Sequence, residues 1–289
     1  MFKAPKSPYL VSYKGKFSVS KARTAGKRVS RDKKRLNDAT EKLDGLQKAL
    51  YAADKHSLLL VFQGMDAAGK DSTIRAVMQG VNPAGCHVVS FKKPSHNELD
   101  HDFLWRIYRA LPQRGRIGIF NRSHYEEVLV VRVHPEILNG QKLPADVDRK
   151  TIWEDRFESI RSMEKHLAQN GTVILKFWLN VSKEEQRQRF LARLDEPDKQ
   201  WKFNAGDISE REHWDDYMQA FEEALNATSR EWAPWYAIPA DSKPYMRATI
   251  AEIIVEALDG LGLSYPVPDE ESRSMFDTYR RALSGPDGK

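Results

Sequence analysis

LLLVFQGMDAAGKDSTIRAVM, residues 58–78, decides the fold of this chain. Residues 58–62 form an apolar run typical of a buried strand, and residues 72–78 have the pattern of a helix. Between them lies the turn Gly64–Asp71, of the form G-x-x-x-x-G-K, which directs backbone N–H groups, a helix dipole and Lys70 to one place. This arrangement suits a chain of phosphates, and a turn without a ligand is the less favoured alternative. The predicted phosphate-binding residues of this segment are Ala67, Ala68, Gly69, Lys70, Asp71 and Ser72.

The loop departs from the usual pattern at the residue after its lysine. A Ser or Thr that holds Mg²⁺ normally stands there, whereas this chain has Asp71, and a second acid, Asp66, lies inside the loop. Carboxylates beside phosphates repel them unless a divalent cation lies between. We therefore expect Mg²⁺ as the cofactor, with Asp66 as a metal ligand and with Asp66 and Lys70 as catalytic residues.

Length and composition limit the classes of protein to consider. A chain of 289 residues can bury a full α/β core, and one domain with a mobile insert is the simplest arrangement. The sequence has neither a secretory signal at its start nor an apolar run of about 18 residues that would span a membrane. Its single cysteine, Cys86, excludes an internal disulfide. We therefore expect a cytoplasmic protein with no membrane partner.

Positive charge is concentrated at the N-terminus. Residues 1–35 contain twelve Lys and Arg and one acid, Asp32, so this segment carries +11 while the whole chain carries +5 and the remainder −6. Residues 1–30 are expected to form a basic arm of the kind that attracts polyanions. The alternative is a solvated and partly disordered tail with no specific partner.

Strand-like and helix-like segments alternate after the arm. Apolar strands are predicted at residues 58–62, 86–91, 117–120, 173–178 and 235–238, and helices at 36–53, 71–78, 102–111, 153–167, 184–194, 208–225 and 245–258. Short apolar strands separated by helices imply a parallel sheet with helices on both faces and ligands at the carboxyl ends of the strands. We therefore expect an α/β, P-loop kinase-like domain at residues 31–265 and a C-terminal tail at residues 266–289.

A helical lid is expected around residues 184–225. The segment Asp195–Gly206 interrupts the helical pattern, and Ser209-x-x-Glu212 has the form of a capping box that would start a second helix. A helix, a polar break and a second helix, placed late in a P-loop fold, are typical of a lid.

A second candidate segment, Asn121-Arg122, ends the strand predicted at residues 117–120. P-loop enzymes place a second metal-orienting group here, usually an aspartate. Asn121 offers a neutral oxygen ligand instead, and the guanidinium of Arg122 suits a phosphate. We predict both as catalytic residues and Asn121 as a metal ligand. An Asn-Arg turn that only closes the strand is the alternative.

The lid contributes basic residues. Arg189 and Arg193 are four residues apart on one helix face, where they repel each other unless an anion lies between them. A phosphate chain would supply that anion, and the alternative is a solvated face on which Glu185 pairs with Arg189. Lys202 lies in the run Lys199–Phe203, where basic and aromatic residues alternate. Arg189, Arg193 and Lys202 are the predicted phosphate-binding residues of the lid.

Four segments together resemble the polyphosphate kinase 2 family over about residues 30–260. They are the loop at residues 64–71, Asn121-Arg122-Ser123-His124-Tyr125-Glu126, the lid run through Arg189 and Arg193, and Lys199-x-Trp201-Lys202-Phe203. The resemblance implies reversible, Mg²⁺-dependent transfer of the terminal phosphoryl group of inorganic polyphosphate to a nucleotide. It also implies a thymidylate-kinase-like fold with a lid.

The resemblance implies roles for individual residues as well. Asp66 and Asn121 would position the metal, although some members of the family carry Asp at the strand end, and Lys70 and Arg122 would hold the transferring phosphate. A Glu at position 126, after Tyr125, resembles the pattern of the subgroup that accepts nucleoside monophosphates as well as diphosphates. Glu126 is the predicted nucleotide-binding residue. We expect adenine and guanine nucleotides as partners and a homo-oligomer.

Two other functions fit part of the sequence. An ATP-dependent nucleoside or nucleotide kinase of the same fold differs only in its phosphoryl donor. A P-loop protein that binds nucleic acid through the basic arm is the other candidate. The chain has no recognition helix or nucleic-acid motif, so we expect no nucleic-acid partner.

Overall fold

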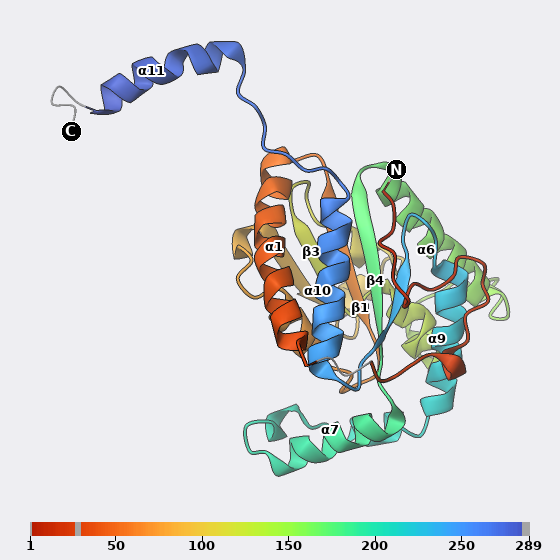
Figure 1. The fold of residues 1–289 in the computed structure, drawn as a ribbon. Helices are drawn as coiled ribbons and strands as arrows, with labels where there is room; N and C mark the ends of the chain where they lie inside the picture. Colours follow the sequence, from red (N-terminus) through yellow and green to blue (C-terminus); the bar gives the residue numbers. More distant parts are fainter. Residues whose placement is uncertain (1, 27–29, 285–289) are drawn as a thin grey trace.

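The computed structural model describes residues 2–26 and 30–284, in which five strands form a sheet (Figure 1). They are β1 (Ser57–Gln63), β2 (Cys86–Ser90), β3 (Ile117–Asn121), β4 (Thr172–Asn180) and β5 (Trp235–Pro239). Their order in the sheet is β2-β3-β1-β4-β5, and each pair of neighbours is parallel. The predicted parallel α/β fold is confirmed.

Helices cover both faces of the sheet. α1 and α10 lie side by side on one face, and α6 and α9 lie on the other (Figure 1). The α-helices are α1 (Asp32–Ala53), α2 (Lys70–Val77), α3 (His96–Leu99), α4 (Trp105–Tyr108), α5 (Val130–Val133), α6 (Ile152–Gln169), α7 (Lys183–Asp195), α8 (Gly206–Glu210), α9 (Trp214–Thr228), α10 (Lys243–Asp259) and α11 (Glu270–Ser284). The 3₁₀ helices are η1 (Val19–Lys21), η2 (Pro83–Gly85), η3 (His124–Val128), η4 (Pro135–Gly140) and η5 (Gln200–Lys202).

The position of each strand explains its composition. β1 lies at the centre of the sheet, and β1, β3 and β5 are buried over their full length, whereas the edge strand β2 is largely exposed. Strands buried on both faces need no polar alternation. In the register of β1 and β3, Phe62 lies opposite Asn121. The loop after β1 and the Asn121-Arg122 turn therefore leave the sheet at the same edge.

The helix predicted at residues 102–111 is shorter than expected. Only α4 is helical there, and the chain continues through turns in which Ala110 N–H donates to Ile107 O and Leu111 N–H to Tyr108 O. Pro112 follows, and a proline disfavours helical backbone at the residue before it. The sequence periodicity continued beyond the point at which the helix ends.

The helix predicted at residues 208–225 is interrupted. α8 ends at Glu210 and α9 begins at Trp214. Ser209 does not cap the second helix, because its hydroxyl donates to Gly206 O inside α8. The predicted capping box is therefore wrong, since Ser209 bonds backwards within its own helical turn.

Residues 2–26 of the predicted basic arm pack on the body of the protein. Tyr9 O accepts a hydrogen bond from Ala237 N–H at 2.8 Å, Val11 N–H donates to Trp235 O at 2.9 Å, and Val11 is fully buried. This segment covers the free edge of β5. An uncovered edge strand would leave backbone N–H and C=O groups unpaired and open to pairing with another chain. A solvated tail therefore does not describe residues 2–26, whereas residues 1 and 27–29 lie outside the described residues.

Two segments project from the body in Figure 1. α7 and the chain after it, within the predicted lid, extend beyond the carboxyl edge of the sheet, and α11 lies far from the body at the end of an extended linker. α11 has no buried residue, and residues 285–289 of the predicted tail lie outside the described part of the chain. No described helix is long and apolar enough to span a membrane.

Candidate active site

The phosphate loop, Gly64–Asp71, turns sharply from β1 into α2. Gly64 has φ +154°, and a Cβ at this position would lie 2.9 Å from Leu179 O, so only glycine fits. Gly69 precedes the helix with φ +103°, a backbone conformation that glycine adopts without strain. Both glycines of the motif are thus required by the path of the backbone.

Lys70 is held inside this loop. Its Nζ donates hydrogen bonds to Gly64 O at 2.8 Å and to Met65 O at 3.3 Å, and the side chain is buried. Burial, together with the neighbouring Arg122 guanidinium, lowers the pKa of Lys70 to about 8. The carbonyl dipoles only partly replace the hydration that the buried ammonium group has lost. An anion such as phosphate would therefore stabilise its charge more strongly than it would stabilise an exposed lysine.

Asn121 lies at the carboxyl end of β3 beside α2. Its Nδ2 donates to Asp71 Oδ1 at 2.8 Å and to Ser90 Oγ at 3.4 Å. Its Oδ1 is buried and accepts no hydrogen bond from any described residue. A buried acceptor without a partner is costly. This oxygen is therefore available to a cation or to a donor on a ligand.

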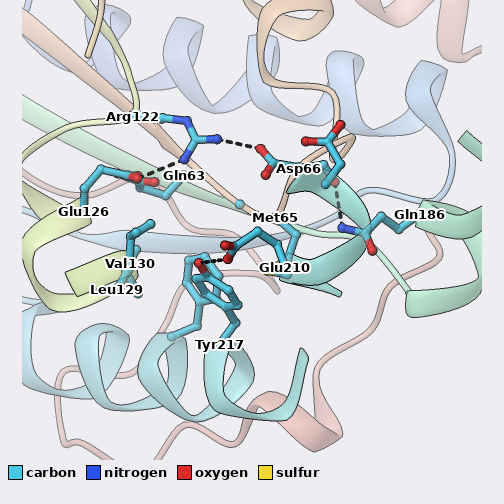
Figure 2. A pocket seen from close by; sticks show the side chains of 13 residues that line it. Gln63, Met65, Asp66, Arg122, Glu126, Leu129, Val130, Gln186, Glu210 and Tyr217 are labelled. Carbon is cyan, nitrogen blue, oxygen red and sulfur yellow. Dashed lines mark hydrogen bonds and ion pairs between the residues drawn. The ribbon is translucent and has the colours of Figure 1, made fainter. Parts of the chain in front are cut away.

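Arg122 joins the loop to the strand end (Figure 2). Its Nη2 lies 2.5 Å from Asp66 Oδ1 and its Nη1 lies 2.9 Å from Glu126 Oε2. The backbone of Arg122 is left-handed, with φ +62°, and its N–H donates to Phe62 O. The structure thus brings three predicted site residues, from two separate segments, into one ionic cluster.

The cluster lines a small cavity beneath the lid. Its volume is about 30 Å³, which is room for about one or two water molecules and not for a nucleotide. Lid residues contribute to it, since Gln186 Nε2 donates to Asp66 O at 2.9 Å and Glu210 lines the space (Figure 2). Asp207 of the lid lines it as well. Tyr217 of α9 bonds to Glu210. Residues of the lid and of the phosphate loop are thus in direct contact at this cavity.

Several lining residues were not predicted as site residues. Those with polar side chains are Gln63, Gln186, Asp207, Glu210 and Tyr217. Gln63 directly precedes the phosphate loop and Gln186 lies in the lid run that includes Arg189, so the sequence motifs themselves pointed to both. Asp207, Glu210 and Tyr217 reach the cavity only because α8 and α9 fold back over it, and no local pattern indicates that.

Arg189 is placed beneath the phosphate loop. Its Nη1 donates to Ala67 O and Ala68 O at 3.0 and 2.8 Å, and its Nη2 donates to Ala240 O at 2.6 Å. Its Nε donates to Glu185 Oε1 at 2.8 Å, so the alternative ion pair is present. All three guanidinium nitrogens are occupied. Arg189 supports the loop in this structure, and its contact with phosphate stays a prediction.

Arg193 and Lys202 differ from Arg189. Arg193 Nη1 lies 3.0 Å from Asp207 Oδ2, and the pKa of Asp207 is raised by its burial and by nearby Asp66. Lys202 is exposed and lies over the ring of Trp201, whose exposed fraction is 78%. Because Trp201 is exposed, it does not belong to the core. The predicted phosphate contacts of Arg193 and Lys202 stay predictions.

The donor set at the loop fits Mg²⁺ bound together with phosphates. No group of three or more His, Cys, Asp or Glu side chains is placed for a metal among residues 2–26 and 30–284. Mg²⁺ usually takes one or two carboxylates, with phosphate and water oxygens completing its six ligands. Asp66 supplies one carboxylate, and the buried oxygen of Asn121 is a neutral donor without a partner among the described residues, so both are donors of the kind that Mg²⁺ takes.

Comparisons with known proteins agree with the resemblance. A model of the family described as polyphosphate kinase 2 matches residues 27–263. The ADP-polyphosphate phosphotransferase of Rhodopseudomonas palustris is 56% identical over 249 residues, which cover 86% of each chain. The AMP/ADP-polyphosphate phosphotransferase of Meiothermus ruber is 47% identical and covers 81% of this chain and 84% of its own.

A solved structure gives the same result. The crystal structure of polyphosphate kinase 2 from Arthrobacter aurescens has a TM-score of 0.86 and 36% sequence identity, and the match covers 96% of this chain and 98% of that chain. Agreement in sequence and fold over nearly the whole length leaves one assignment: the chain belongs to the polyphosphate kinase 2 family.

Proposed function

We propose that this protein transfers the terminal phosphoryl group of inorganic polyphosphate to ADP and also to AMP, reversibly and with Mg²⁺. Membership of the family makes it a polyphosphate–nucleotide phosphotransferase. The observation that carries the proposal is the Asp66–Arg122–Glu126 cluster beside the phosphate loop with its buried Lys70. The names of the relatives at 56% and 47% identity support both acceptors.

The residues have separate tasks in this proposal. Lys70 and the loop N–H groups bind the phosphate next to the bond that breaks, and Arg122 exchanges its carboxylate partners for oxygens of the transferred phosphoryl group. Glu126 lies at the opposite side of Arg122 from Asp66, where the acceptor would enter (Figure 2). The transfer would be direct and in line, because such sites act by positioning and by charge stabilisation.

Mg²⁺ would be held by Asp66 and by the oxygen of Asn121. When bound, it neutralises charge on the phosphate oxygens. Asp66 and Asn121 supply oxygen donors from the loop and from the end of β3, and Asp71 keeps the Asn121 amide turned so that its oxygen stays free.

A product assay tests the proposal. Purified protein with Mg²⁺ and polyphosphate is incubated separately with AMP, ADP, GMP and GDP, and the nucleotide products are separated by ion-exchange chromatography. We expect ATP from ADP and ADP from AMP. Absence of product from both adenine nucleotides would contradict the proposal. Turnover with ATP as donor and none with polyphosphate would select the ATP-dependent kinase instead.

The two lid arginines should respond differently to removal. Arg193→Ala is expected to raise the KM for polyphosphate about tenfold with an unchanged melting temperature, because it removes one charge-assisted phosphate contact. Arg189→Ala should lower the melting temperature and kcat, because it leaves the loop carbonyls without donors.

Arg187→Ala is the matched control on the same helix, since Arg187 is half exposed and pairs with Glu184 one turn away. Steady-state kinetics and thermal melts of the three variants separate the roles. Equal KM effects from Arg187→Ala and Arg193→Ala would show that only the total charge of α7 matters.

A further inference from the structure

Lys176 lies buried in the middle of the sheet. It is the one Lys, Arg, Asp or Glu in the five described strands, and its exposed fraction is 0%. In the register of the sheet it lies between Val61 of β1 and Trp235 of β5. The lysine therefore occupies a position that an apolar residue would normally fill.

A closed network surrounds the lysine. Its Nζ donates to Glu164 Oε2 at 2.6 Å, to Tyr125 Oη at 2.8 Å and to Thr228 O at 2.9 Å, which uses all three donors. Tyr125 Oη in turn donates to Glu164 Oε1 at 2.8 Å. Glu164 and Tyr125 are also fully or almost fully buried. The network thus joins β4, α6 and η3 through polar groups inside the core.

Stability alone does not explain this network. Desolvation offsets most of the attraction within a buried ion pair, and well-packed apolar residues of similar volume are often as stable or more stable. What a satisfied polar network adds is a fixed geometry, because each hydrogen bond constrains distance and direction.

The network ends at the segment that carries two site residues. Tyr125 precedes Glu126 directly and follows Arg122 by three residues. Ser123 holds the start of η3, since its Oγ accepts hydrogen bonds from Tyr125 N–H and from Gln63 Nε2. The left-handed backbone of Arg122 is unfavourable for a residue with a side chain and persists only where the surrounding structure holds it. The direction of the Arg122 side chain therefore depends on how firmly the flanking residues are held.

We propose that Lys176 and Glu164 are positioning residues that act through Tyr125 to fix Arg122 and Glu126 over the phosphate loop. Tyr125 connects the core network to the η3 turn, and the turn sets the guanidinium between Asp66 and Glu126. The inference rests on the proposed function for its kinetic consequence, whereas its structural consequence can be measured without substrate.

The test removes the whole network at once. The triple variant Lys176→Met, Glu164→Leu, Tyr125→Phe leaves no unpaired charge in the core, so it should fold, as checked by circular dichroism and thermal melts. We expect kcat to fall about tenfold or more with little change in the KM for polyphosphate, because misplacement of a positioned group costs rate. A kcat within twofold of wild type in the folded variant would overturn the proposal.

A double-mutant cycle tests whether the effect passes through Arg122. In an Arg122→Gln background, removal of the network should lower single-turnover rates by a clearly smaller factor than in the wild-type background, because Arg122, one of the two groups that the network positions, is absent. The same fold loss in both backgrounds would contradict a positioning role. Leu43→Ala, a buried change in α1 outside the network, controls for general destabilisation and should leave kcat unchanged.

An NMR measurement tests the geometry without turnover. The Nε–H signal of Arg122 is assigned by its loss in Arg122→Gln. Its chemical shift should differ from that of a free arginine in the wild type and in Leu43→Ala, and it should move close to the free-arginine value in the triple variant. An unchanged signal would overturn the proposal. If the wild type makes no nucleotide product, the proposed function fails while this signal still decides the positioning role.

Tyr125→Phe alone provides a second variant should the triple variant not fold. It keeps the Lys176–Glu164 ion pair and removes only the hydroxyl that links the pair to η3. We expect a severalfold lower kcat and a shifted Arg122 signal. Wild-type kinetics together with an unshifted signal would again contradict the proposal.

Discussion

Lys70→Met is expected to reduce kcat/KM for polyphosphate by about 100- to 1,000-fold, the usual cost of removing one preorganised charge-stabilising donor. The ammonium group already lies inside the loop, where it donates to Gly64 O and Met65 O. A phosphate would replace these weak partners with a full negative charge. Methionine has a similar length and no charge, so it fills the space without supplying the interaction.

The same variant should not lose stability. Burial lowers the pKa of Lys70 from 10.5 to about 8, so the folded protein holds this proton less firmly than the unfolded chain does. The cost of the buried charge is therefore fully present below about pH 8 and disappears as the pH rises toward 10.5. Methionine removes that cost at neutral pH, which offsets the loss of two hydrogen bonds.

Two measurements check this prediction. Denaturant unfolding from pH 7 to 10.5 should show the wild type gaining stability relative to Lys70→Met as the pH rises, and steady-state kinetics give kcat/KM. Lys48→Met is the control, because Lys48 lies on the exposed face of α1 and pairs with Asp44. Near-normal turnover of Lys70→Met would show that the loop does not bind the reacting phosphates.

The sequence predicted the sheet well because its strands are uninterrupted apolar runs. Residues 58–62 and 117–120 fall within β1 and β3, and a parallel sheet necessarily brings their carboxyl ends together. The pairing of the loop with Asn121-Arg122 could therefore be predicted without the structure. The packing of residues 2–26 could not be predicted. Composition shows that the segment is basic, but it does not show that the segment pairs with the edge strand β5.

The lid shows the limit of local patterns. Arg189 and Arg193 share a helix face, yet Arg189 reaches under the loop whereas Arg193 pairs with Asp207. Their partners differ because they depend on where α7 lies relative to the sheet, which the spacing of the two arginines does not show. Lys176 shows a different limit. It stood inside the predicted strand 173–178, where strand periodicity gave no reason to single it out, and only the packing of α6 and η3 reveals its partners.

Asp66→Asn should lower kcat by at least about 100-fold, since removal of a metal-binding, charge-stabilising group in such sites has effects of this size. Asparagine keeps the shape of the side chain but loses the charge that would hold Mg²⁺ and that now pairs with Arg122 at 2.5 Å. The variant should respond weakly to added Mg²⁺, whereas the wild type should be strongly activated.

Binding of polyphosphate in the presence of EDTA separates metal binding from phosphate binding. Without a metal, the Asp66 carboxylate repels the incoming phosphates, so Asp66→Asn should bind the chain at least as tightly as the wild type does. Added Mg²⁺ should then tighten binding to the wild type and have little effect on the variant. Calorimetric titration with and without Mg²⁺ measures both quantities.

Asp71→Asn is the comparison that assigns the metal to one of the two acids. The Asp71 carboxylate accepts a hydrogen bond from Asn121 Nδ2, so its role is to orient that amide, and its loss should cost less activity than the loss of Asp66. An Asp66→Asn variant with near-normal turnover and an inactive Asp71→Asn variant would move the metal to Asp71. The loop would then follow the usual arrangement after all, with an acid in place of the hydroxyl that normally follows the lysine.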